Sequence, residues 1–366
     1  MPRYNKAIDR ICYNGLDGFL FVSEKNSMTG TVAYLVLAHE ANEQLFRLTN
    51  ALLADKRSRV YLHLDAKLLD VGWVEVFGDP RLIVLSGRLG VNWGGYSVVK
   101  ATLLLLRRAL ADVSNEQFAL LSGSCFPLMP TDQINDRVLG LSTPLISLWG
   151  KIDPALNRGE GLGRYVVTKF HPHDRDILTP KTSRVHERAW NLYKWLNARL
   201  PYERKVDIVD MWKGSQFFIV NHEYAKVCAN PPAALVKALR YALAPDEIMF
   251  TTLIVRYGKT KNKTFATVSS EEAQQGSHFI IKRVPPKRTL HERMFHKIDL
   301  RQLALSDADK AVASGALFAR KCSADVSESI AAWWTSEHPV EVKRIKVSAA
   351  EGSNDLELTV SYTAFS

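Results

Sequence analysis

The amino-terminal part of the chain alternates short apolar segments with helical ones, and this alternation constrains the fold more than any other feature. A β-branched run, TVAYLVLA, covers Thr31 to Ala38, and the next segment, ANEQLFRLTNALL, has apolar residues at helical spacing. Two more apolar runs, Arg59 to Asp65 and Arg81 to Gly87, indicate buried strands. The pattern predicts an α/β fold with a mostly parallel central sheet covered on both faces. In such sheets ligands bind beyond the carboxyl ends of the strands.

The rest of the chain continues this pattern with one interruption. The segment YSVVKATLLLLRRALAD predicts a helix that leads into the strand FALLSGS. Residues 151–212 are polar and basic, with a helix expected at VHERAWNLYKWLNARL, and we interpret them as a substrate-facing insertion. A strand at SQFFIV and helices near 224–228, 233–243 and 246–255 then resume the α/β pattern. At the carboxyl terminus two alternating segments around EGSND predict a small β-hairpin.

Composition narrows the class of partner without choosing it. The 366 residues are 46% hydrophobic, which is ample for a folded core, and their formal net charge of +10 favours anionic partners. Nucleotides, nucleic acid, anionic polysaccharide and an anionic membrane surface all fit. No apolar run approaches the roughly 20 residues of a membrane span. We therefore expect a cytoplasmic protein, with peripheral contact at the inner face of the cell membrane as an alternative. The four cysteines are widely separated: Cys12, Cys125, Cys228 and Cys322. Their spacing indicates neither a metal site nor a set of disulfides.

Four short motifs match patterns of metal or phosphate binding, but none fits such a site well. GEGLG at 159–163 lacks the order of a phosphate-binding loop and is expected to be a flexible loop. DRD at 174–176 and DAD at 307–309 match the DxD pattern that holds divalent metals, but neither follows a strand. SDADK also fits a helix N-cap with an acidic first turn. HPH at 171–173 has the wrong spacing for one helical face. We predict no metal site.

Five other motifs follow one another along the chain. They are NWGGYSVVKA at 92–101, LLSGSCFPLMP at 120–130, MWKGSQFFIVNHEYA at 211–225, APDE at 244–247 and LFARK at 317–321. Their order resembles the core-2/I-branching β-1,6-N-acetylglucosaminyltransferases and the related peptide xylosyltransferases, over about residues 31–322. SGSCFP departs from the family in having Cys125 before Phe-Pro, where we expect a buried thiol.

The resemblance implies a GT-A fold, which is Rossmann-like, and an inverting transfer of a sugar from a UDP-sugar without a metal or other cofactor. N-acetylglucosamine is the first candidate sugar and xylose the second. The acceptor would be a glycan or glycolipid, in surface polysaccharide or glycoconjugate synthesis by a bacterial protein. The implied organisation is an N-terminal extension at 1–30, a glycosyltransferase domain at 31–322 with the acceptor-side insertion at 151–212, and a helix and β-hairpin at 323–366.

The resemblance also assigns candidate residues to roles. Glu247 matches the family's catalytic base, and Lys321, with Arg320 beside it, matches the cation that stabilises the departing diphosphate. A second cation upstream is Lys282 or Arg283, although alignment also permits His278. The candidates for uridine and donor binding are His39, Asp65, Trp93, Ser122 and Gly123. The candidates for acceptor and donor-sugar contact are Trp212, Lys213, Gly214, Ser215, Asp246, Arg184 and Arg188.

Other interpretations stay open from the sequence. APDE also fits an ordinary helix start, because proline suits the first turn and carboxylates interact favourably with the helix dipole. Trp93 and Trp212 also fit core packing, and Arg184 and Arg188 fit a solvated helix face. A polyanion- or nucleic-acid-binding module is the main alternative function. It would need basic residues clustered among exposed aromatics, whereas Lys and Arg are dispersed here, so we expect no nucleic-acid partner.

Overall fold

The computed structural model describes residues 30–69, 71–156, 162–172, 174, 184–268, 277–281 and 302–337. The strands are β1 (Thr31–Ala38), β2 (Ser58–Leu64), β3 (Leu82–Val84), β4 (Asn115–Ser122), β5 (Cys125–Pro127), β6 (Leu145–Lys151), β7 (Trp212–Asn221), β8 (His278–Ile280) and β9 (Phe318–Arg320). The helices are α1 (Glu43–Leu53), α2 (Trp73–Val76), α3 (Tyr96–Leu110), α4 (Thr131–Leu139), α5 (Tyr165–Thr168), α6 (Arg184–Arg199), α7 (His222–Ala229), α8 (Ala233–Leu239), α9 (Asp246–Thr260), η3 (Leu305–Asp307), α11 (Ala308–Ala313) and α12 (Ala324–Glu337).

A six-stranded sheet forms the centre of the fold, in the order β3-β2-β1-β4-β7-β6. Strands β3, β2, β1 and β4 are parallel, whereas β7 is antiparallel to both of its neighbours. The prediction of a mostly parallel α/β sheet is confirmed. Strand β1 is buried almost throughout, which explains its continuous apolar sequence.

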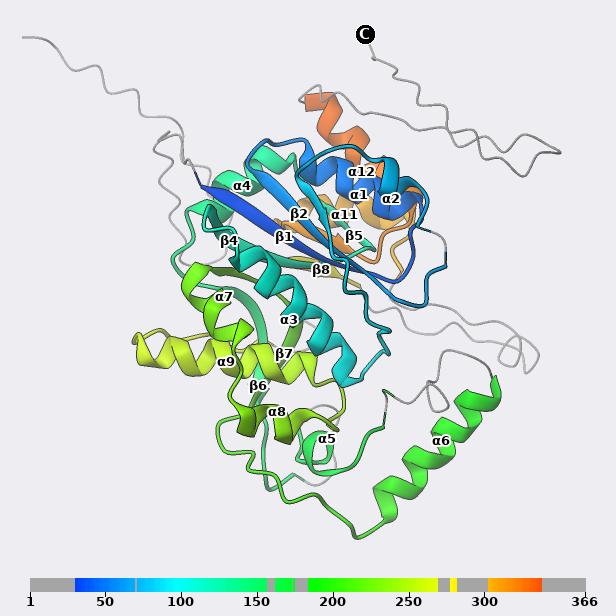
Figure 1. Ribbon diagram of the computed structural model, residues 1–366, viewed down its shortest axis with the longest axis vertical. Helices are drawn as coiled ribbons and strands as arrows, with labels where there is room; N and C mark the ends of the chain where they lie inside the picture. Colours follow the sequence, from blue (N-terminus) through cyan, green and yellow to red (C-terminus); the bar gives the residue numbers. More distant parts are fainter. Residues whose placement is uncertain are drawn as a thin grey trace, which may run out of the picture.

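Helices cover the two faces of this sheet (Figure 1). Helix α3 packs on β1 and β2 and also contacts α7 and α9. Helix α1 contacts α4 and α12. Helix α1 begins at the N-cap Asn42, whose side chain accepts a hydrogen bond from the Leu45 backbone N–H. Three of its leucines, Leu45, Leu48 and Leu52, are fully buried. The apolar residues at helical spacing in the sequence therefore form the face of α1 that is turned to the core.

A second sheet of three short strands, in the order β5-β9-β8, lies beside the first. Strand β9 is antiparallel to β5 and parallel to β8. This second sheet has its own apolar cluster, in which the rings of Phe126 and Trp334 stack with 5.3 Å between their centroids. This sheet brings residues 318–322 back to the end of β4, and the sequence did not predict it.

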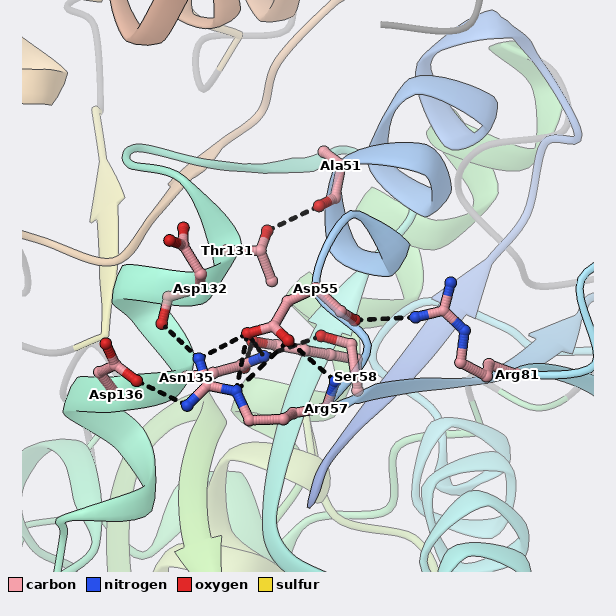
Figure 2. A network of polar contacts seen from close by, with 10 residues as sticks. Ala51, Asp55, Arg57, Ser58, Arg81, Thr131, Asp132, Asn135 and Asp136 are labelled. Atoms are coloured by element: carbon pink, nitrogen blue, oxygen red, sulfur yellow. Dashed lines mark hydrogen bonds and ion pairs between the residues drawn. The ribbon is translucent and has the colours of Figure 1, made fainter. Parts of the chain in front are cut away.

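A buried polar network closes the amino end of β2 (Figure 2). Asn135 on α4 donates to Asp55 and to Ser58, both at 3.0 Å, and accepts from the Tyr34 hydroxyl at 2.6 Å. Arg57 binds the Asp55 carboxylate at 2.6 Å and reaches the Asp136 carboxylate at the same distance. The network ties α4 to the turn between α1 and β2, at the end of β2 opposite Asp65.

The predicted helices and strands agree with the structure where the apolar pattern of the sequence extends over many residues. Strand β1 has the predicted bounds, and the helices expected at 185–200 and 246–255 are α6 and α9. Strand β6 was not predicted. The proposed amino-terminal extension and carboxyl-terminal hairpin lie outside the described residues. None of the helices in the described ranges is long and apolar enough to cross a membrane.

Candidate active site

The carboxyl ends of β1, β2 and β4 lie next to one another, as the fold predicts. The backbone N–H of Asp65 donates to the carbonyl of Ala38 at 2.8 Å, and that of Gly123 donates to the carbonyl of Leu37 at 2.9 Å. A Cβ atom on Gly123 would lie 3.2 Å from that of Ala38. Glycine is thus favoured at 123 because β4 ends so close to β1. This close packing holds the ends of β1, β2 and β4 together at the candidate site.

Asp65 organises the loops at this edge. Its carboxylate accepts hydrogen bonds from the backbone N–H groups of Lys67 at 2.9 Å and Val91 at 3.2 Å. The neighbouring His63 is buried and accepts from the Leu89 N–H through Nε2, and burial lowers the pKa of its imidazole. Asp65 therefore fixes the segment that leads to Trp93. A contact of Asp65 with uridine stays a prediction.

Two other donor-side candidates are accessible at this edge. Trp93 is 51% exposed, beside Gly94 in the left-handed conformation at φ 75°. His39 follows β1 and is exposed, with Nε2 at 3.7 Å from a carboxylate oxygen of Glu40. Contact of Trp93 or His39 with a donor stays a prediction.

The end of β9 brings two cationic residues to the loop after β4. Arg320 donates from Nε to the Ser122 hydroxyl at 3.0 Å, and its guanidinium lies 4.9 Å from the ring centre of Phe217. Lys321 is next in the chain, and the following residue, Cys322, donates its N–H to the Ser124 carbonyl at 2.8 Å. Ser122, Gly123, Arg320 and Lys321, which the resemblance assigned to donor binding, are thus brought together.

His278 does not supply a further positive charge. It is only 3% exposed, and burial, followed by the charge of Arg320, lowers the pKa of its imidazole to about 3. Its ring stacks on Phe217 at 4.6 Å between centroids. Its burial and stacking favour a neutral packing role for His278 over that of a second cation. Lys282 and Arg283, the other candidates, lie outside the described residues.

Cys125 is the buried thiol that the sequence predicted. It is fully buried, and its Sγ accepts from the Ser122 backbone N–H at 3.3 Å. Burial raises the pKa of the thiol. Cys125 thus helps to shape the loop that carries Ser122 and Gly123.

The first turn of α9 carries the second chemical group of the site. Ala244 has φ 49° and donates its N–H to the Gly94 carbonyl at 3.0 Å, so the loop before α9 is tied to the tryptophan–glycine loop. Glu247 then faces Lys213 on β7, with 3.1 Å between its Oε2 and the lysine Nζ. The Lys213 side chain is 7% exposed and that of Glu247 is 26% exposed. Glu247 is therefore a solvent-accessible carboxylate held by a buried cation.

Asp246 has a different environment from its neighbour. It is 6% exposed, and its Oδ1 has no hydrogen-bond partner among the described residues. Burial raises the pKa of its carboxyl to about 7, and the charge of Glu247 adds to this effect. The two carboxylates of APDE are thus not interchangeable, which an ordinary helix start would not require.

The other candidates on β7 have packing contacts. A Cβ atom on Gly214 would meet the Ser147 carbonyl oxygen at 2.3 Å, so glycine lets β7 approach β6. The Ser215 hydroxyl accepts from the Phe217 N–H at 3.2 Å. Trp212 is half-buried, and its indole N–H donates to Asp210 at 2.9 Å. Sugar contact by these three residues stays a prediction.

The acceptor-side segment contributes a residue whose role the sequence did not show. Asp174, part of the DRD motif, accepts from the Ser97 hydroxyl at 2.6 Å and from its backbone N–H at 3.1 Å. This carboxylate occupies the amino end of α3, where the helix dipole favours negative charge. Arg188 is exposed on α6, which Figure 1 shows apart from the sheet. Arg184 is the first residue of α6.

The second DxD motif lies at the start of a helix. Asp307 is at the N-cap position of α11 and Asp309 lies in its acidic first turn, as predicted, but the Asp307 carboxylate accepts from the Ala304 N–H at 2.8 Å and makes no cap hydrogen bond to α11. Within the described ranges, no three His, Cys, Asp or Glu side chains are grouped so as to hold a metal ion.

The sheet order and the site at its carboxyl edge define the class of protein: this is a GT-A-like α/β fold of the kind that glycosyltransferases use. The profile of the Branch family, Core-2/I-Branching enzyme, matches residues 32–274. The chain belongs to this family, and it is accordingly assigned to the glycosyltransferases, which join a sugar donor to a glycan acceptor. A comparison with curated proteins gives no match.

Proposed function

We propose that this protein is an inverting glycosyltransferase that moves a sugar from a UDP-sugar to a hydroxyl group of a glycan or glycolipid acceptor, without a metal. N-acetylglucosamine is the first candidate sugar and xylose the second, with a β-1,6 linkage and a role in surface polysaccharide or glycoconjugate synthesis. The observation that carries this proposal is Glu247, an accessible carboxylate in the first turn of α9 that is paired with Lys213.

Strand β7 links the carboxylate to the cations. Lys213, near the start of the strand, pairs with Glu247, and Phe217, four residues later, lies beneath Arg320. Four residues of extended chain span at most about 14 Å. One end of the site thus offers a proton acceptor and the other offers positive charge, which is the polarity that a sugar diphosphate requires.

The chemistry follows from this polarity. Glu247 takes the proton of the acceptor hydroxyl as the acceptor oxygen forms its bond to the anomeric carbon from the side opposite the leaving group. The bond between the anomeric carbon and the diphosphate oxygen breaks, its electron pair leaves with UDP, and the configuration inverts. Arg320 and Lys321 stabilise the charge that develops on the diphosphate. Fixed cations in this position take the part that a metal ion plays in other enzymes.

Transfer is expected to persist when divalent metals are removed. A panel of UDP-sugars should be screened in EDTA, with binding measured by calorimetry and turnover by UDP release. UDP-N-acetylglucosamine is expected to bind and to be turned over at the same rate with and without the chelator. Loss of activity in EDTA with recovery on adding manganese would contradict the roles of Arg320 and Lys321. Absence of binding by every UDP-sugar would contradict the proposed donor class.

Replacing Lys321 by methionine is expected to weaken UDP binding by about 10- to 100-fold, because a hydrogen bond to a charged group contributes about 1.5–3 kcal/mol. The substitution keeps the length of the side chain and removes its charge. Lys310→Met is a matched control, since Lys310 is exposed on α11. Calorimetric titration with UDP checks the result. Equal affinities of the Lys321 variant and the control would remove Lys321 from the diphosphate site.

A further inference from the structure

Lys213 is an unusual residue in the site because its ammonium group is buried. The whole residue is 5% exposed, and its Nζ lies 3.1 Å from Glu247 Oε2 and 5.8 Å from the centre of the Trp149 ring. Burying an ammonium group is costly unless opposite charges compensate it. A lysine whose only task was to contact a sugar hydroxyl would not need this burial.

The surroundings of Lys213 contain two carboxyl groups. Helix α9 supplies Glu247 and Asp246, and the charge of Lys213 acts on both. The facing strand β6 supplies the Trp149 ring and the buried Ser147, neither of which carries a charge. One cation therefore faces two adjacent carboxyls, one accessible and one buried.

The ion pair also divides the Glu247 carboxylate between two tasks. Oε2 is bound to Lys213, whereas Oε1 has no hydrogen bond or ion pair to any described residue. A base must present one oxygen to the hydroxyl whose proton it takes. Holding the other oxygen to a rigid, buried cation fixes the direction of the open one.

We infer that Lys213 is a positioning residue for Glu247: it orients the carboxylate toward the acceptor hydroxyl and serves as the shared counter-ion of Glu247 and Asp246. This inference rests on the proposed function, because it assigns Lys213 to the residue that takes the proton. Lys213 itself exchanges no proton in the reaction. Its ammonium group holds Glu247 Oε2 and offsets part of the negative charge of the two adjacent carboxyl groups.

The test is a pH–rate profile of kcat/KM for Lys213→Met with UDP-N-acetylglucosamine and its acceptor. Loss of an adjacent positive charge makes a carboxylate harder to ionise. The acid limb of the profile is therefore expected to move up by about 1 pH unit, and kcat to fall by at least about 10-fold, with KM for the donor nearly unchanged. Lys213→Arg should restore the limb. Lys261→Met is the control, since Lys261 pairs with Glu223 at 3.6 Å beyond the far end of α9.

A control variant and a second measurement, of stability, complete the test. Asp246→Asn replaces a carboxyl that is still protonated below about pH 7, so its acid limb should stay at the wild-type position. The loss of melting temperature in Lys213→Met should also be larger at pH 8 than at pH 5, because the carboxyls left without their cation are ionised at the higher pH. A lysine that only fills space would give the same loss at both values.

These outcomes separate the inference from the proposed function. If Glu247→Gln keeps wild-type turnover, Glu247 is not the base and the proposed mechanism fails. If Glu247→Gln is inactive but Lys213→Met does not move the acid limb, and its melting-temperature loss is independent of pH, the mechanism stands and the role of Lys213 is overturned.

Discussion

Replacing Glu247 by glutamine is expected to lower turnover by about 10²–10⁴-fold, which is the usual contribution of general acid–base catalysis. Glutamine has nearly the same shape as glutamate but cannot accept the proton of the acceptor hydroxyl. The cations at Arg320 and Lys321 are untouched, so affinity for the UDP-sugar should stay within a few-fold of wild type. Turnover by UDP release, donor affinity by calorimetry and melting temperature together test this expectation.

Glu223→Gln is a matched control for this substitution. Glu223 also lies in the first turn of a helix, α7, so its negative charge interacts with a helix dipole in the same way. Such an interaction is worth about 0.3–1 kcal/mol of stability and nothing in catalysis. If Glu247→Gln and Glu223→Gln had similar, small effects, APDE would be only a helix start, and the proposed mechanism would be wrong.

The same comparison distinguishes the two acidic residues of APDE. Asp246 is buried with an unpartnered oxygen, whereas Glu247 is accessible and paired with Lys213. Asp246→Asn is therefore expected to change turnover at the pH optimum far less than Glu247→Gln. A sequence pattern shared by two carboxylates thus corresponds to two different environments.

Much of the main sheet was predictable from the sequence, because its signals are local. Strand β1 is a β-branched run whose residues are buried on both faces, and α3 and α9 have long apolar patterns. The short strands β5, β8 and β9 have three residues each, too few to show a period. They exist because residues far apart in the chain pair with one another, as Cys125 does with Arg320.

In the candidate site, too, contacts between residues far apart in the chain could not be predicted from the sequence. The sequence singled out Glu247, Lys213, Ser122 and Arg320 through their motifs. It did not show that Lys213 pairs with Glu247 or that Arg320 donates to Ser122 across 198 positions of the chain. The DRD pattern relates Asp174 only to a metal site, which we do not predict, whereas its carboxylate binds the amino end of α3. Pairings of this kind depend on the tertiary fold, which spacing along one chain does not encode.

Replacing Asn135 by leucine is expected to cost about 2–5 kcal/mol of unfolding free energy, because each buried polar group left without its partner costs about 1–3 kcal/mol. Asn135 is fully buried, and leucine has a similar volume. The change leaves the Tyr34 hydroxyl, the Ser58 hydroxyl and an oxygen of Asp55 each without one hydrogen bond (Figure 2). Urea unfolding at pH 7 measures the loss. Asp136→Asn, which breaks an ion pair with an exposed carboxylate, should cost below about 1 kcal/mol.

The loss in Asn135→Leu should also depend on pH. Burial tends to raise the pKa of Asp55, but the hydrogen bonds from Arg57 and Asn135 outweigh it, and the pKa lies below the ordinary value of 3.8. A carboxyl with a lowered pKa stabilises the fold above that value, and this stability is lost as the pH falls through the folded-state pKa. Removing one of the hydrogen bonds raises the folded-state pKa and reduces the contribution. The difference between variant and wild type should therefore be larger at pH 7 than at pH 3. One ordinary hydrogen bond contributes about 1 kcal/mol. A difference in unfolding free energy below about this value at pH 7 would show that the network does not hold α4 to the sheet.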